Sequence, residues 1–169
     1  MMQEAELRKS FRFSVEEWHR AALEGTDLPV RFRVVGHSMR PLIRRERDDV
    51  TVVPLHRAPE IGDIVLFFRE HRNDYVLHRV FRVNGEMVQT FGDGCLAPDP
   101  WTHARNLWGV AVKIERGRAS LDPNGSLCRL YARAWVGLWR VRRYLFLPGR
   151  AARKLGRIAK RLLKREKTG

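Results

Sequence analysis

Three short segments of the chain carry side chains that could together hydrolyse a peptide bond. They are Gly36-His-Ser-Met-Arg-Pro41, Tyr75-Val-Leu-His-Arg-Val80 and Gly92-Asp-Gly-Cys-Leu-Ala-Pro-Asp99. These segments supply a hydroxyl at Ser38, an imidazole at His78, and carboxylates at Asp93 and Asp99. A serine hydroxyl is a poor nucleophile until a base takes its proton and a third group holds that base in the right tautomer. The set therefore contains the side chains that a Ser-His-Asp hydrolase needs, but their order in the chain proves little, because such triads recur in several chain orders.

Each role has a competitor within the same segments. Asp99 is the expected carboxylate partner of the histidine and Asp93 is the second candidate, although either could instead hold backbone N–H groups of its own loop. His37 competes with His78 as the base because it adjoins the serine. Cys95 is expected to behave as a small buried hydrophobe and not as a reactive thiol.

Strands are needed to bring these segments together, and alternating apolar residues predict them. Val30, Phe32 and Val34 alternate with arginines, which is the period of a half-buried strand. Further strands are expected at Asp49–Val53, Ile61–Phe68, Tyr75–Val83, Glu86–Phe91 and Leu107–Glu115. Asn84-Gly85 predicts a two-residue type I′ hairpin turn. Asp63 is expected to be a turn residue, and Gly92 to Asn106 a loop.

Helices are predicted at both ends of the strand region. Ser14 and Glu17 form a capping-box pattern, which predicts a short helix over Val15–Glu24 that stops at Gly25. After Ser126, apolar residues recur at three- and four-residue steps, which predicts an amphipathic helix. They are Leu127, Leu130, Tyr131, Ala134, Trp135 and Leu138. Pro148-Gly149 interrupts this pattern, and a second basic helix is expected over Arg150–Lys164.

These elements divide the chain into three parts around one mainly β body. Residues 1–28 are expected to be a helical segment, residues 29–125 the β domain that carries the chemistry, and residues 126–169 a basic amphipathic helical tail. A length of 169 residues allows one domain with a real core plus appendages.

The strong positive charge of the chain belongs to its tail. Arg129 to Lys167 hold fourteen Lys and Arg against the single acid Glu166, so only one positive charge of the net +14 falls on residues 1–128. An anionic partner would therefore be attracted by the tail. Trp135 and Trp139 favour an anionic membrane surface, with aromatic rings at headgroup depth. Nucleic acid is a less favoured partner, and a solvated charge run is the third alternative.

Composition favours a cytoplasmic protein whose tail allows attachment to the inner membrane surface. Cys95 and Cys128 have neither metal-ligand nor CxxC spacing, so a reduced setting without a metal or other cofactor is expected. The N-terminus lacks the apolar core of a secretory signal. The most apolar stretch, Leu127 to Leu147, carries five arginines, each of which costs roughly 2.5–3.5 kcal/mol at mid-bilayer.

The three segments, together with a fourth, resemble the boxes of one peptidase superfamily. GHSMRP resembles the G-x-S-M-x-P nucleophile box of signal peptidase I and LexA-like proteins, and Ile61-Gly-Asp-Ile-Val65 is similar to the strand that follows it. LHRV resembles the box of archaeal and endoplasmic-reticulum signal peptidases, in which histidine stands where bacterial enzymes carry lysine. GDG to PDP is similar to their GDN-to-D box. The resemblance covers Val30 to Gly117.

The resemblance implies a serine endopeptidase on a LexA/signal-peptidase-like coiled β-sheet, acting on a peptide or precursor protein. Ser38 would be the nucleophile, His78 the base and Asp99 its partner, with Asp93 in reserve. Gly36 stands where signal peptidases commonly carry a serine, as in LexA-like members, so backbone N–H groups around Ser38 would hold the oxyanion. The oxyanion and substrate groove would be formed by Gly36, His37, Met39 and Pro41.

The chain departs from the superfamily in two respects. It shows no transmembrane anchor, which separates it from the processing of exported preproteins, and no Ala-Gly self-cleavage site precedes the serine box. A rival hypothesis is a non-catalytic module that keeps the peptidase fold and binds nucleic acid or anionic membrane through residues 126–169. Such a module would bind with a steep salt dependence and would be indifferent to changes at Ser38 and His78.

Overall fold

The computed structural model describes residues 14–69 and 72–139. The chain divides into two compact units, Met1–Arg133 and Ala134–Gly169. The described residues of the second unit are 134–139, of which 134–137 belong to a helix that begins at Ser126. The predicted break at Pro148-Gly149 and the predicted basic helix over Arg150–Lys164 lie outside the described residues.

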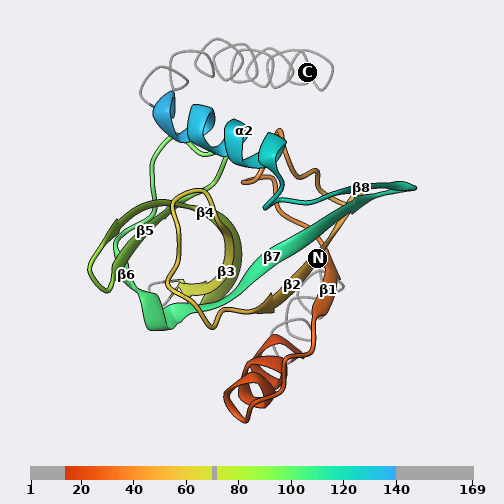
Figure 1. The fold of residues 1–169 in the computed structure, drawn as a ribbon, viewed down its shortest axis with the longest axis vertical. Coiled ribbons are helices and arrows are strands. Elements are labelled where there is room, and N and C mark those ends of the chain that lie inside the picture. The colour runs from red at the N-terminus through yellow and green to blue at the C-terminus, as the bar shows by residue number, and fades with distance from the viewer. Residues whose placement is uncertain (1–13, 70–71, 140–169) are drawn as a thin grey trace, which may run out of the picture. The chain divides into compact units, whose positions relative to one another are not determined.

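The first unit is built on an antiparallel sheet, which confirms the mainly β prediction. Its strand order is β1-β2-β7-β3-β4-β5-β6, with β8 paired to β7. Figure 1 shows β3 to β6 curling round on themselves, whereas β7 continues as a long strand toward β8. The strands are β1 (Val30–Arg33), β2 (Asp48–Pro54), β3 (Ile64–Arg69), β4 (Asp74–Asn84), β5 (Met87–Phe91), β6 (Thr102–His103), β7 (Leu107–Arg116) and β8 (Ala119–Leu121).

All six predicted strands are present, and two short ones were not predicted. β3 begins at Ile64 and not at Ile61, because Gly62 turns the chain with a φ of +104°. The predicted loop from Gly92 to Asn106 is wrong in its last five residues, which form β6 and the 3-10 turn Ala104–Asn106. Both β6 and β8 are too short to show a period of their own.

The hairpin between β4 and β5 is confirmed, but its turn lies one residue further along the chain. Asn84 pairs with Met87, so the two turn residues are Gly85 and Glu86. Gly85 has a φ of +56° and is the only one of the two with a positive φ. A glycine with positive φ at the first central position is the type II′ arrangement, so the predicted type I′ turn is wrong.

Two hydrophobic clusters form the core. The larger lies over β1, β2 and β7 and includes Val15, Met39, Ile43 and Val50, all buried. The smaller lies within the curl of β3, β4 and β5. It consists of Val65, Phe67, Val80, Val88 and Leu107. The serine segment therefore rests on the first cluster, and the histidine strand takes part in both.

The N-terminal helix covers the larger cluster. In the described chain it covers residues 14–23 and ends one residue before the predicted end at Glu24. The ring of His19 stacks on Trp108 of β7 with centroids 3.8 Å apart. A Cβ on Gly109 would stand 2.7 Å from the ring of Trp18, so a glycine is required there for the helix to approach the sheet.

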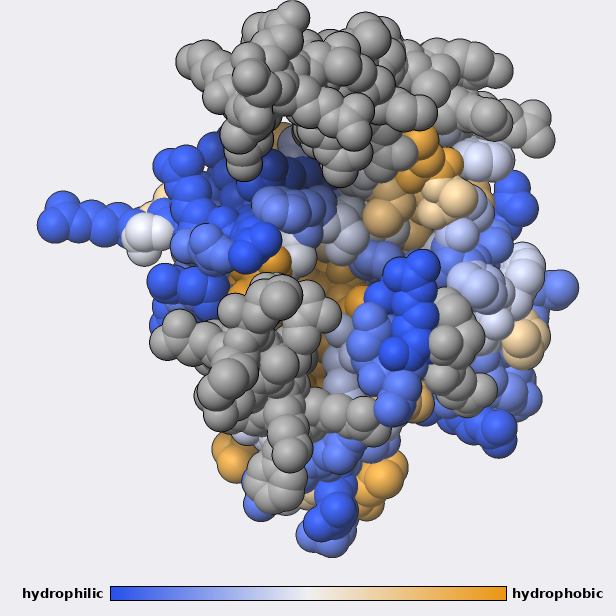
Figure 2. All heavy atoms as spheres, turned by 180° about the vertical axis from the view of Figure 1, so that it is seen from behind, coloured by the Kyte–Doolittle hydropathy of each residue, from blue (hydrophilic) through white to orange (hydrophobic). Residues whose placement is uncertain are grey.

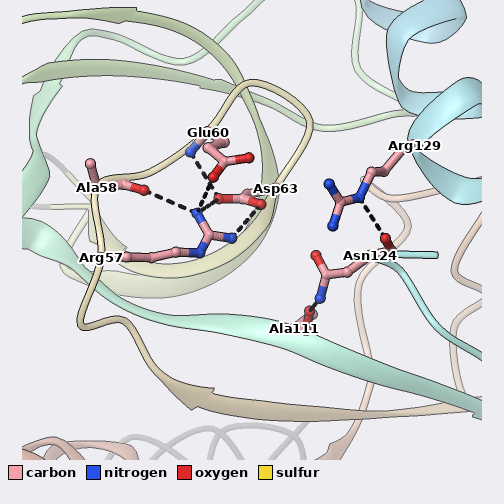
Figure 3. A network of polar contacts seen from close by, with 7 residues as sticks. All are labelled: Arg57, Ala58, Glu60, Asp63, Ala111, Asn124 and Arg129. Atoms are coloured by element: carbon pink, nitrogen blue, oxygen red, sulfur yellow. Dashed lines mark hydrogen bonds and ion pairs between the residues drawn. The ribbon is translucent and has the colours of Figure 1, made fainter. Parts of the chain in front are cut away.

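Hydrogen bonds and an ion pair hold the loop before β3, around Arg57 and Asp63, in place, as Figure 3 shows. Asp63 accepts two hydrogen bonds from Arg57, at 2.8 and 2.9 Å, and one from the Glu60 N–H at 2.9 Å. This confirms Asp63 as a turn residue. The Asp63 carbonyl accepts from the Val80 N–H at 2.8 Å, and the Gly62 N–H donates to the Val80 carbonyl at 2.9 Å. The turn is thereby attached to β4 two residues after His78.

Helix α2 (Ser126–Gly137) follows β8, at the position where the amphipathic helix was predicted. Its start is tied to β7, because Asn124 donates to the Ala111 carbonyl and Arg129 donates to the Asn124 carbonyl, at 3.3 and 2.6 Å (Figure 3). Within the described residues, no helix has the length and apolar character needed to cross a membrane.

Candidate active site

His78 lies in the middle of β4, where the strand is buried on both sides. It pairs with Val65 of β3, and its side chain is 4% exposed. Its ring lies 6.1 Å from that of Phe67. A histidine enclosed by two neighbouring strands has a fixed ring plane, so its two nitrogens point in defined directions.

The carboxylate of Asp99 holds one of these nitrogens. Nδ1 of His78 and Oδ2 of Asp99 are 2.6 Å apart. The same oxygen accepts from the Thr90 hydroxyl at 2.7 Å. The loop is fixed to β5, since the Asp99 N–H donates to the Thr90 carbonyl at 2.9 Å and Gln89 donates to the Asp99 carbonyl at 3.0 Å. The sequence-predicted pairing of Asp99 with His78 is therefore present in the structure.

The electrostatics of Asp99 fix the tautomer of the histidine. Burial raises the pKa of the Asp99 carboxyl, but hydrogen bonds from His78 and Thr90 and the positive charge of Arg69 outweigh it, so the pKa lies below its ordinary value. Asp99 is therefore ionised at neutral pH and can only accept hydrogen bonds. Nδ1 of His78 must then carry a proton, which leaves Nε2 of the neutral ring as the acceptor.

Ser38 begins the turn that follows β1, and the third segment is packed directly against it. The Gly94 N–H donates to the Ser38 carbonyl at 2.6 Å. A Cβ on Gly92 would stand 2.8 Å from the Ser38 carbonyl oxygen and 3.0 Å from Nε2 of His78. The backbone of Ser38 and the free nitrogen of His78 thus lie against the same glycine. The three segments meet at this point.

The side chains of Ser38 and His78 are not hydrogen-bonded to each other in this structure. Both residues are described, and no hydrogen bond joins Ser38 to His78. Ser38 is half-buried, and its Oγ lies 3.9 Å from where a Cβ on Gly36 would stand. Catalytic hydrogen bonds are often long before a substrate binds, so this geometry is compatible with a nucleophile and its base.

Asp93 does not face the histidine, because it is bound elsewhere. Its two oxygens accept from Arg79 at 2.8 and 2.7 Å, and the Tyr131 hydroxyl lies 3.4 Å away. Arg79 also donates to the Gly62 carbonyl at 2.8 Å. Asp93 and Arg79 are both fully buried. Asp93 is therefore a structural ion-pair residue that holds the loop between Gly92 and Gly94, and not a second partner of His78.

The remaining predicted groove residues divide into exposed and buried ones. Gly36, His37 and Pro41 are exposed around Ser38. His37 lies 3.4 Å from Nη1 of Arg45, and in the described chain it has no hydrogen bond to Ser38. Met39 was expected to line the groove but is buried in the larger core cluster, because the turn after Ser38 directs its side chain inward.

The sequence does not predict the buried carboxylate of Asp48, which binds the chain segment that follows the serine turn. Asp48 accepts from the Arg44 N–H at 2.8 Å and from Arg116 at 2.7 and 2.5 Å. Arg116 also donates to the Leu42 carbonyl at 2.9 Å. The hydrogen bond from Arg116 lowers the pKa of the Asp48 carboxyl despite its burial. This pair holds the chain segment that leaves the Ser38 turn.

Thr90 and Arg79 are further supporting residues that the sequence analysis missed. Thr90 lies two residues after the buried Val88 in β5 and is buried like it, and Arg79 follows the buried Leu77 and His78 in β4. A hydroxyl or guanidinium in a buried part of a strand must have a polar partner. That rule could have pointed to both residues, although the partner would still have been unknown.

A pocket of about 230 Å³ adjoins the carboxylate side of the site. Its walls combine aromatic rings with polar groups. They come from Phe67, Phe68, Arg69, Asp99, Pro100, Trp101 and Thr102. Asp99 therefore contributes both to the pocket and to the contact with His78.

In the described part of the chain, neither the cysteines nor a group of metal ligands forms a second candidate site. Neither Cys95 nor Cys128 forms a disulfide bond. Cys95 is half-buried beside Gly92, and burial raises the pKa of the Cys128 thiol. Across residues 14–69 and 72–139, no group of three His, Cys, Asp or Glu side chains is arranged to hold a metal ion.

Comparison of the chain with protein-family models, with curated proteins and with solved structures found no match. The functional conclusion therefore depends on the residues and contacts described above.

Proposed function

We propose that the chain is a serine endopeptidase with a LexA/signal-peptidase-like fold, which cleaves a peptide or the leader of a small precursor protein. The observation that carries the proposal is the 2.6 Å contact between His78 and Asp99, with Nε2 of the same ring against the glycine that also contacts Ser38. An imidazole oriented by a carboxylate beside a serine is the arrangement that activates a hydroxyl.

In the proposed mechanism, Oγ of Ser38 attacks the scissile carbonyl carbon while its proton passes to Nε2 of His78. The C–N bond then breaks, and His78 returns the proton to the leaving amine. Water attacks the resulting ester with the help of the same nitrogen and releases Ser38. Asp99 stays ionised throughout and stabilises the imidazolium by accepting from Nδ1.

Backbone groups of the serine turn are the proposed oxyanion donors. The Ser38 N–H donates to no acceptor within the described part of the chain. Gly36 adds no side chain that could compete for this position. A donor of this kind contributes about 3–4 kcal/mol to transition-state stabilisation.

The pocket beside Asp99 is the proposed binding place for one substrate side chain. The rings of Phe67 and Trp101 favour an apolar group, and a volume of about 230 Å³ accommodates one such side chain. Filling this pocket would also exclude water from Asp99 and strengthen its interaction with His78.

The experiment is mass spectrometry of a diverse peptide pool incubated with the protein. The wild type and the exposed-serine control Ser120→Ala are expected to cleave the same peptides, whereas Ser38→Ala and His78→Ala are expected to cleave none above background. Circular dichroism would establish that all four proteins are folded. Equal cleavage by Ser38→Ala, or intact peptides with every variant, would exclude the proposal and favour a module that only binds.

A further inference from the structure

Helix α2 packs against neighbouring loops and the sheet through one face that contains few buried residues. Its buried residues are Cys128 and Ala132. A Cβ on Gly62 would stand 3.2 Å from that of Ala132, so the helix lies close to the turn before β3. Tyr131 approaches Asp93 and the guanidinium of Arg79, whose central carbon is 5.5 Å from the ring centroid. Small and aromatic side chains of α2 thus make its contacts with the turn before β3 and with the buried Asp93 and Arg79.

The leucines of α2 face the other way. Leu127 is 81% exposed and Leu130 is 67% exposed. The exposed Ala134 lies four residues after Leu130, on the same side of the helix, and Leu138 beyond it is 51% exposed. An amphipathic helix normally directs its apolar stripe to the core. Here Leu127 and Leu130 are directed outward. The coloured part of the face in Figure 2 is largely hydrophilic, with separate hydrophobic patches.

Positive charge accompanies this stripe. Arg129 and Arg133 are exposed on the same helix, and α2 contains no acidic residue. Residues 126–169 carry fourteen Lys and Arg against one Glu. Exposed aliphatic side chains among arginines are complementary to a surface that is apolar inside and anionic outside.

We propose that the outward face of α2, formed by Leu127 and Leu130, is a docking surface for an anionic lipid bilayer. The leucines would enter the boundary between headgroups and acyl chains while the arginines meet lipid phosphates. Nucleic acid fits less well, because its phosphates bind basic groups and its bases stack on aromatic ones, and exposed leucines gain nothing from either contact. This proposal is independent of the peptidase proposal.

The test is co-sedimentation of the full chain with vesicles of phosphatidylcholine containing about one third phosphatidylglycerol, and with vesicles of phosphatidylcholine alone. Leu127→Gln/Leu130→Gln is the test variant. The matched control is Leu23→Gln/Leu28→Gln, because these leucines are 75% and 66% exposed in the N-terminal part of the first unit. We expect at least about tenfold weaker binding for the test variant, and less than about twofold for the control. Neutral vesicles should bind the wild type at least about tenfold more weakly than anionic ones.

Three results would overturn this assignment. Equal binding by the test variant and the wild type would mean that charge alone attracts the chain. A lower unfolding midpoint of the test variant with unchanged vesicle binding would mean that another part of the chain covers the leucines. Binding to a single-stranded RNA probe but not to anionic vesicles would make nucleic acid the partner. The single variant Leu127→Gln, expected to weaken binding by about threefold or more, provides the same readout with less risk to folding.

Discussion

Replacing Arg79 by methionine is expected to destabilise the protein strongly, because it leaves the carboxylate of Asp93 buried without its arginine. The two side chains are 2% and 0% exposed and are joined by two hydrogen bonds of 2.8 and 2.7 Å. Removing one partner of such a pair costs about 3–5 kcal/mol. With a urea dependence of about 2 kcal/mol per molar, the unfolding midpoint should fall by about 1.5–2.5 M.

The control for this variant is an arginine in an exposed pair. Arg33 also binds a carboxylate through two nitrogens, that of Asp49, but its side chain is 61% exposed. Arg33→Met should leave the urea midpoint almost unchanged, because solvent screens such a pair. The double variant Arg79→Met/Asp93→Leu should recover most of the stability lost by Arg79→Met, because no buried charge remains.

Urea unfolding followed by tryptophan fluorescence measures all of these variants. The reasoning is refuted if Arg79→Met shifts the midpoint no further than Arg33→Met. It is also refuted if the double variant is less stable than Arg79→Met alone, since the buried charge would then not be the cause of the loss.

Three further predictions follow from the same contacts. Gly92→Ala should lower the free energy of unfolding by about 1–3 kcal/mol and the rate of peptide cleavage by about a hundredfold, because the new Cβ would stand 2.8 Å from a backbone oxygen. The control is Gly137→Ala, whose Cβ would meet nothing within 4 Å. Thr90→Val should raise the pKa of Asp99 in a carbon-13 NMR titration, because one hydrogen bond to the carboxylate is lost; an unchanged pKa would contradict this. Asp48→Asn should destabilise the protein at pH 7 but progressively less as the pH falls below about 4, because a carboxyl with a lowered pKa stabilises the fold only while it is ionised. A difference in thermal unfolding midpoint between the variant and the wild type that is the same at about pH 7 and about pH 3 would exclude this.

Much of the fold could be predicted from period and turn residues. The alternation of Val30 and Phe32 predicts β1, and the buried strands β3 and β4 are long enough to stand out. The register of the hairpin could not be predicted, because a type I′ turn at Asn84-Gly85 and a type II′ turn at Gly85-Glu86 both suit this sequence, and pairing across the strands decides between them.

The site was less predictable than the strands, because its residues meet only after folding. The sequence offers both Asp93 and Asp99 as the carboxylate partner of His78. Only the contact of Asp93 with Arg79 in the structure removes Asp93 from that role. Met39 lies beside the serine in the chain but enters the core, which depends on the direction of the turn. The spacing of apolar residues correctly predicts the helix α2, but it does not indicate that its leucines face outward.

Covalent labelling is the most direct test of the central claim that Ser38, His78 and Asp99 act together. A fluorophosphonate loses fluoride when an activated serine oxygen attacks its phosphorus, and intact-protein mass spectrometry with peptide mapping locates the adduct. One adduct on Ser38 is expected in the wild type and in Ser120→Ala, with labelling at least about a hundredfold slower in His78→Ala. Labelling of Ser38 at the same rate in His78→Ala, or an adduct at another residue only, would contradict the account.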